Sequence, residues 1–303
     1  MSKPERLSGG HRLCAGCGAG IAVRGVLRAL KPEDKAVICS ATGCLEVSTC
    51  LYPYSAWNDS FIHNAFENAG ATISGSEAAY RSLKKQGKVN EDYKFIAFGG
   101  DGGTYDIGFQ SLSGAMERGH DMTYVCYDNG AYMNTGIQRS SGTPMYADTT
   151  TSTVGKNSPG KMQQGKNLTE IIAAHNVAYV AQTTFMSNFK DLQMKAEKAL
   201  YTPGASFLNI MAPCPRGWRY ETEDIMEVCK MAVETCTWPM YEVENGKWTL
   251  NHMPKNKRPV EDYLKLQGRF KHLFKKGNEH LINDIQVGVD KNWQALLKKC
   301  EVA

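Results

Sequence analysis

Residues 95–119 read FIAFGGDGGTYDIGFQSLSGAMERG. An apolar run, a glycine-rich turn and a helical pattern follow one another, so the stretch predicts a strand, a tight turn and a helix. Glycines at a strand end let the backbone approach a phosphate closely, and the helix behind them offers free N–H groups and a positive dipole end. The stretch favours a phosphate site, with a purely structural turn as the alternative.

The rest of the first 211 residues has the same alternating character. Short β-rich runs are separated by segments with helical spacing, which predicts βαβ units, an α/β fold and a mainly parallel sheet flanked by helices. Ligands are then expected beyond the carboxyl ends of the strands. The predicted strands are 35–39, 94–98, 122–127, 177–181 and 206–211, and the predicted helices are 18–30, 64–85, 106–117 and 187–200.

A second polar group follows the next predicted strand. The sequence MTYVCYDNG places Asp128 and Asn129 at that strand's end, one helix and one strand after Asp101. Asp101 and Asn129 are therefore expected side by side at adjacent strand ends. A carboxylate and an amide oxygen, completed by phosphate oxygens and water, make a site suited to Mg²⁺.

This pair of motifs resembles the thiamine diphosphate signature, and DNGAYMNTG, residues 128–136, is similar to the 2-oxoacid:ferredoxin oxidoreductases. The resemblance implies the thiamine diphosphate-binding, PP-type α/β fold. It also implies that Asp101, Asn129 and the backbone carbonyl of Ala131 hold Mg²⁺ on the cofactor. The implied cofactor contacts further include Gly100, Gly102, Gly103, Thr135, Cys44 and His63.

Two of the candidate contacts have ordinary alternatives. Asn134 would be the catalytic residue and would face the substrate or the adduct that the substrate forms with the cofactor. Equally, Asn134 could only cap the NTG turn. His63, in FIHNAFENAG, precedes a predicted helix and could touch the diphosphate, or it could be a satisfied core or surface histidine.

The resemblance also gives a purpose to CAGCGAG, residues 14–20, because the family carries a [4Fe–4S] cluster beside its cofactor. It implies Cys14, Cys17, Cys44 and Cys214 as ligands, all in loops beside strand ends or a helix start, a placement that suits four converging thiolates. Cys50 competes with Cys44 for the third position. A four-cysteine zinc site has the same ligand count, so a non-catalytic zinc scaffold protein is the alternative from another class.

The chain after residue 220 changes character. We expect residues 1–220 to form the cofactor and iron–sulfur domain and residues 221–303 a C-terminal helical extension. Tyr263, Leu266, Phe270 and Leu273 fall on one helical stripe with basic residues around it. This pattern favours an amphipathic helix that packs on the body or on a partner subunit over a ferredoxin-docking patch.

The resemblance spans nearly the whole chain and implies a β subunit. The implied reaction is the coenzyme A-dependent oxidative decarboxylation of pyruvate to acetyl-CoA and CO₂, with electrons passing through the cluster to ferredoxin. Phenylglyoxylate, 2-oxoisovalerate and oxalate are alternative substrates. We find no second, pyrimidine-binding domain and no CxxCxxCxxxCP run, so an α subunit and γ and ferredoxin-type δ subunits are expected as partners.

Composition excludes other classes of function. With 303 residues, 42% of them hydrophobic, the chain can bury a sizeable core. A net charge of +4 gives no general case for nucleic acid or an anionic membrane as partner. No stretch approaches the roughly 18 apolar residues of a membrane span, and ten cysteines suit a reducing compartment, so a cytoplasmic protein is expected.

Overall fold

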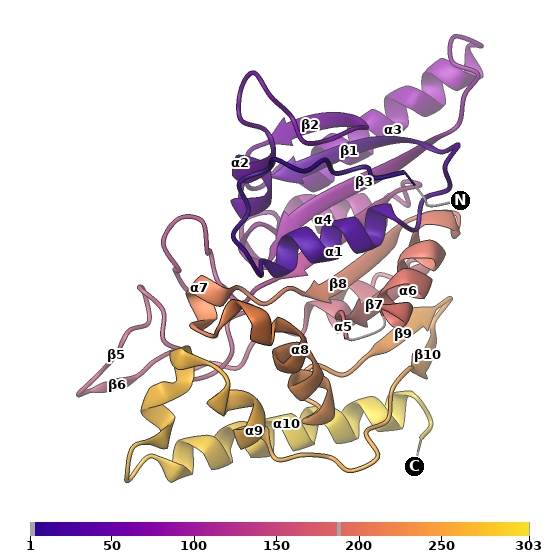
Figure 1. Ribbon diagram of the computed structural model, residues 1–303. Coiled ribbons are helices and arrows are strands. Elements are labelled where there is room, and N and C mark those ends of the chain that lie inside the picture. The colour runs from indigo at the N-terminus through magenta and orange to yellow at the C-terminus, as the bar shows by residue number, and fades with distance from the viewer. Residues whose placement is uncertain (1–3, 187–188, 303) are drawn as a thin grey trace.

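The computed structural model describes residues 4–186 and 189–302 and is built on one eight-stranded sheet (Figure 1). The strand order is β10-β9-β7-β8-β4-β3-β1-β2, and β5 and β6 form a separate two-stranded ribbon. The strands are β1 (Lys35–Ala41), β2 (Ser60–Asn64), β3 (Tyr93–Gly100), β4 (Thr123–Asp128), β5 (Val154–Gly155), β6 (Ser158–Pro159), β7 (Tyr179–Thr183), β8 (Ser206–Met211), β9 (Tyr241–Glu244) and β10 (Lys247–Leu250).

Helices cover both faces of the sheet. Side chains of α1, α6 and α8 share one buried cluster, and those of α3, α4 and α5 belong to the other. No helix in the described ranges is long and apolar enough to cross a membrane. The α-helices are α1 (Gly18–Leu27), α2 (Cys44–Thr49), α3 (Ala69–Lys85), α4 (Phe109–Glu117), α5 (Leu168–Ala173), α6 (Lys190–Tyr201), α7 (Pro215–Trp218), α8 (Ile225–Glu234), α9 (Val260–Lys265) and α10 (Glu279–Lys299).

The central strands are apolar on both faces because helices lie above and below them. In β3, Phe95 and Ala97 belong to one core cluster, whereas Ile96 and Phe98 belong to the other. This alternation is the period-two pattern of a strand with two covered faces. β2, β1, β3, β4, β8 and β7 pair in parallel, as the alternation of strands and helices predicts.

The predicted α/β fold with a mainly parallel sheet is confirmed, but two helix predictions have wrong starts. The predicted helix 64–85 begins only at Ala69, because Asn64 ends the edge strand β2, whose half-exposed side chains give a weak strand signal. The predicted helix 106–117 begins only at Phe109, because Asp106 ends a π-helical turn, η1 (Gly102–Asp106). The predicted helix 187–200 appears as α6 from Lys190, and residues 187–188 lie outside the described residues.

The strand order brings four loops to one edge. β8, β4, β3 and β1 are consecutive neighbours, and all pair in parallel, so their carboxyl ends meet at the same edge of the sheet. The segments that follow them begin with Cys214, Asn129, Asp101 and Cys44 within a few residues of each strand end. On the left of Figure 1, α2, α7 and the start of α1 gather at this edge.

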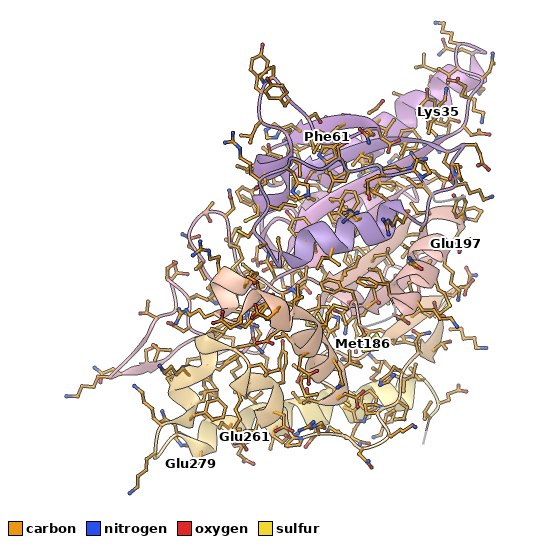
Figure 2. The ribbon with its side chains drawn as sticks, viewed as in Figure 1. Lys35, Phe61, Met186, Glu197, Glu261 and Glu279 are labelled. Carbon is orange, nitrogen blue, oxygen red and sulfur yellow. The ribbon has the colours of Figure 1, made fainter. Side chains whose placement is uncertain are left out.

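The segment after residue 220 is more than a helical extension. β9 continues the main sheet antiparallel to β7, and β10 pairs antiparallel to β9, while the division at residue 220 stays a prediction. The predicted amphipathic helix is wrong in one respect, because it is divided into α9 and a 3₁₀ helix, η3 (Gly268–Phe274). Tyr263, Phe270 and Leu273 are buried against the body nevertheless. Figure 2 labels Glu261 and Glu279 on this segment, at the end of the molecule opposite to Phe61.

Packing of the C-terminal segment can be tested with two phenylalanines four residues apart. Phe270 is fully buried, whereas Phe274 is an exposed side chain of the same 3₁₀ helix. Phe270→Ala should lower the free energy of unfolding by about 3–5 kcal/mol, because it removes a packed ring and leaves a cavity. Phe274→Ala should lower it by less than about 0.5 kcal/mol. Equal losses in denaturant titrations of both variants would mean that the segment is not docked as described.

Candidate functional site

Asp101 and Asn129 lie side by side, as the two motifs predict. Gly100 pairs with Tyr127 across β3 and β4, so the residues after these strands are neighbours. The backbone N–H of Asn129 donates to Oδ1 of Asp101 at 3.3 Å, and Asp101 has no exposed surface. The hydroxyl of Ser140, from the long loop after β4, donates to the other carboxylate oxygen of Asp101.

The Asn129 side chain completes a cluster of oxygen ligands. One end of its amide group faces Oδ1 of Asp101 at 3.0 Å and the backbone oxygen of Ala131 at 2.8 Å. If the amide nitrogen is at that end, it donates a hydrogen bond to each of these two oxygens. If the amide oxygen is at that end, it forms a group of three neighbouring oxygens with them. Three converging oxygens fit one face of an octahedral Mg²⁺ site. The donor set of this chain therefore fits the ion that the sequence resemblance implies.

Burial raises the pKa values of the two carboxyl groups at this site. Burial, and next the neighbouring Asp128, raise the pKa of Asp101 well above its ordinary value. The pKa of Asp128 is raised to about 6, also by burial, although its bonds from the Tyr105 hydroxyl and the Gly130 N–H act in the other direction. When both buried carboxyl groups are ionised, their negative charges repel each other, and a bound cation would offset this repulsion.

A small cavity of about 20 Å³ opens beside these ligands. Its volume is that of one water molecule, because the Tyr132 ring closes it: a Cβ placed on Gly102 would lie only 2.4 Å from Cε1 of that ring. A diphosphate in this position therefore requires the ring to move. The predicted contacts in the cavity wall are Gly100, Gly102, Gly103, Asn129, Ala131, Asn134 and Cys44.

Two predicted contacts, Thr135 and His63, lie outside the cavity wall. Thr135 is exposed, and its hydroxyl bonds within its own loop to Gln138. His63 does not line the cavity, and its Nδ1 lies 2.6 Å from a carboxylate oxygen of Glu46. Asn134 is exposed at the cavity's rim. The roles of these three residues toward a cofactor stay predictions.

The four predicted cluster cysteines meet at the same edge of the sheet. The turn that carries Cys14 and Cys17 reaches it because the Gly18 N–H donates to the oxygen of Pro213 at 3.1 Å. A Cβ on Gly18 would lie 2.5 Å from the Ala212 carbonyl carbon, so this close approach requires glycine. Cys17 and Cys214 are the N-caps of α1 and α7, and Cys44 is the first residue of α2. Free N–H groups and dipoles at helix starts favour thiolates.

The four thiols also perturb one another. Burial, with smaller contributions from Cys214, Cys17 and Cys14, raises the pKa of Cys44 to about 12. Burial likewise raises the pKa of Cys17, with smaller contributions from Cys214 and Cys14. Because the pKa values of Cys17, Cys44 and Cys214 are raised, a positively charged metal would be needed to stabilise their thiolates.

The spacing of these thiols does not suit a single zinc ion. Tetrahedral zinc holds its sulfurs within about 4 Å of one another, yet within the described ranges no three of the four cysteines have sulfurs within 4.8 Å of one another. A cube of four irons holds its thiolates farther apart. The pKa of Cys50, about 11, is raised by burial and by Glu46. The strand cysteines Cys39 and Cys126 are fully buried, as their positions predict.

Two residues that the sequence reasoning missed join the two halves of the site. The indole N–H of Trp218, four residues after Cys214, donates to the Asn129 backbone oxygen at 2.5 Å. The guanidinium of Arg269 lies 3.9 Å above the Trp218 ring. Basic residues that flank an apolar helical stripe are usually solvated, yet Arg269 is 2% exposed. Gly130 has a φ of +70°, and a Cβ there would lie 2.9 Å from Nη1 of Arg269, so this turn requires glycine.

The long loop between β4 and α5 supplies further missed contacts. The Lys161 ammonium is buried and donates to the Ser141 and Thr143 backbone oxygens. Lys166 donates to the oxygen of Tyr105. Serines and lysines in an aperiodic loop carry no positional signal, so only the length of this loop indicated a function.

Comparison with known proteins gives a consistent result. The profile of the family described as thiamine pyrophosphate enzyme, C-terminal TPP binding domain, matches residues 41–210, more than half of the chain. The pyruvate synthase subunit PorB of Thermotoga maritima is 52% identical over 97% of this chain and 91% of its own length. The PorB subunit of Methanocaldococcus jannaschii is 49% identical over 97% of both chains.

Two other proteins extend the comparison. The ketoisovalerate oxidoreductase subunit VorB of Pyrococcus abyssi is 43% identical over 98% of this chain and 94% of its own. Among solved structures, a 2-oxoglutarate:ferredoxin oxidoreductase from Magnetococcus marinus superposes with a TM-score of 0.57 at 22% identity, over 76% of this chain and 80% of that one. At this identity the superposition supports the fold alone.

The oxygen cluster predicts an unusual response to Asp101→Asn. A carboxyl group with a raised pKa opposes folding once it is charged, so a neutral amide of the same shape should leave the melting temperature of the metal-free chain unchanged or higher. Mg²⁺-dependent binding of thiamine diphosphate should weaken at least about tenfold, because a charged ligand is lost. Scanning calorimetry and titration calorimetry measure the two effects. A lower melting temperature with unchanged cofactor affinity would contradict the assignment.

Proposed function

This chain belongs to the 2-oxoacid:ferredoxin oxidoreductase β subunits, and we propose that it acts in the coenzyme A-dependent oxidative decarboxylation of pyruvate to acetyl-CoA and CO₂. Two electrons leave the substrate and reduce ferredoxin through a [4Fe–4S] cluster. PorB relatives of pyruvate synthase at 52% and 49% identity support pyruvate as the substrate. Membership of this family also removes the ground for the zinc scaffold alternative.

One observation carries the proposal. The cavity lined by Asn129 and Ala131 also has Cys44 in its wall, so a proposed cluster ligand borders the proposed cofactor pocket. The strand order causes this, because the loop after β1 lies beside the loop after β3. Cys44 would therefore hold one corner of the cluster at the wall of the cavity in which Asn129 and Ala131 would hold the cofactor's metal.

Thiamine diphosphate supplies the electron sink for decarboxylation when it is bound, and the protein supplies binding, orientation and electrostatics. Asp101, Asn129 and the Ala131 carbonyl would hold Mg²⁺ against the diphosphate. Gly102 and Gly103 at the start of η1 line the same cavity, and a helix start leaves its first backbone donors free, so these N–H groups would be available to the diphosphate. Cys14, Cys17, Cys44 and Cys214 would hold the cluster.

Further subunits are part of the proposal. An α subunit would carry the pyrimidine-binding domain, and γ and ferredoxin-type δ subunits would pass electrons to external ferredoxin. All ten cysteines are free thiols in the structure, which supports a reducing cytoplasm as the compartment.

The VorB relative favours 2-oxoisovalerate as a second candidate substrate. The two substrates differ only in the size of an apolar group, which a pocket distinguishes by about 1–3 kcal/mol per methylene. Activity of the assembled enzyme against a panel of 2-oxoacids decides between them. Preference for pyruvate is the expected result, and preference for 2-oxoisovalerate would replace it.

The third cluster ligand is tested by two matched serine variants. Cys44→Ser should lower the iron content and remove the EPR signal of the reduced cluster, since Cys44 lies among the other thiols. Cys50→Ser should leave both unchanged, because Cys50 contacts Glu46 instead. Retention of the signal in Cys44→Ser together with its loss in Cys50→Ser would move the third ligand to Cys50.

The subunit proposal predicts that the isolated chain carries a cluster yet decarboxylates no 2-oxoacid. The glutamate that promotes the reactive form of the cofactor is expected on the α subunit. Anaerobic CO₂ release should be measured with thiamine diphosphate, Mg²⁺, coenzyme A and a viologen acceptor, first for this chain and then for the assembled complex. Comparable rates for the two samples would exclude the subunit proposal.

A further inference from the structure

Glu46, Cys50 and His63 form a second cluster of potential metal ligands beside the sheet edge. Within the described residues this is the one group whose histidine, cysteine and carboxylate ligand atoms all lie within 4.8 Å of one another. Nδ1 of His63 lies 2.6 Å from Oε1 of Glu46, and the Cys50 thiol lies 3.4 Å from the same oxygen. We propose that these three side chains form a binding site for a borderline divalent cation, of which Zn²⁺ is the type.

The local fold keeps this group apart from the cluster cysteines. Glu46 and Cys50 are four residues apart on α2 and its C-cap, so they share one face of the helix. Cys44 is only two residues before Glu46, and residues at that spacing point to different sides. His63 comes from β2, the edge strand of the sheet, two residues after the Phe61 labelled in Figure 2.

The chemistry of the three ligands selects the metal. One sulfur, one imidazole nitrogen and one carboxylate oxygen suit zinc, whereas Mg²⁺ and Ca²⁺ take oxygen ligands only. Zinc binding would replace the thiol proton that Cys50 now donates to the Glu46 backbone oxygen at 2.9 Å, with release of that proton. A thiolate, a carboxylate and Zn²⁺ together make an electrically neutral site, with neutral imidazole as third ligand.

Exposure leaves a way in for the ion. The Glu46 side chain is 8% exposed, but the His63 side chain is 59% exposed and forms the outer wall. Three protein ligands on a tetrahedral ion leave the fourth position for water. This site is independent of the proposed oxidoreductase activity.

The test uses the full chain, purified anaerobically with its cluster in place, and Zn²⁺ as the probe. One zinc per chain should bind beyond the iron content, and the zinc-edge X-ray absorption spectrum should show one sulfur among lighter ligands. Cys50→Ser and His63→Ala should each weaken zinc binding more than about tenfold, since even outer partners of metal ligands contribute about that much. Cys300→Ser, a partly buried thiol elsewhere, should leave the affinity unchanged.

Two results would overturn the site: unchanged zinc affinity in Cys50→Ser, or a zinc spectrum with four sulfurs, which would place the ion on the cluster cysteines. Iron content and the EPR signal of the same samples report on the cluster separately. Absence of iron with intact zinc binding would therefore count against the proposed function and not against this site.

Discussion

The buried carboxylate of Asp101 is the interaction on which the site depends. The side chain has no exposed surface, lies beside Asp128, and receives its hydrogen bonds from Ser140 and the Asn129 backbone. These hydrogen bonds lower the free-energy cost of burying the charge of Asp101. They do not offset the repulsion from the neighbouring carboxylate of Asp128. A cation shared with Asn129 and the Ala131 carbonyl, as proposed above, would balance this charge, so metal binding would fix the ionised state of Asp101.

The parallel sheet places this carboxylate beside the cysteines. β8, β4, β3 and β1 are neighbours, and each presents one element of the site in the loop after its carboxyl end. Trp218 then ties the loop of Cys214 to the loop of Asn129 through one hydrogen bond, and Arg269 packs on its ring. Arg269, from the C-terminal segment, therefore supports the indole that joins the two candidate metal-binding loops.

The sequence allowed prediction of the features that have a local pattern. The central strands, the glycine turn and the pairing of Asp101 with Asn129 follow from apolar runs and from the common edge of parallel strands. The choice of the four cysteines came instead from the family resemblance. β2 and β10 were missed because they are edge strands, half exposed and without an apolar run. β9 was missed because it has only four residues and buries only alternate side chains. Arg269 was missed because burial of a cation depends on Trp218, which lies far away in the sequence. Ser140 and Lys161 were missed because their loop has no period.

The proposed function requires that one edge of the sheet holds both the metal ion of the cofactor's diphosphate and the iron–sulfur cluster, in adjacent loops. Crystals of the assembled enzyme with thiamine diphosphate and Mn²⁺ in place of Mg²⁺ test it through anomalous scattering at the manganese and iron edges. We expect one manganese peak between Asp101, Asn129 and Ala131 and an iron peak among Cys14, Cys17, Cys44 and Cys214. Manganese bound away from Asp101, or no iron among these four cysteines, would contradict it.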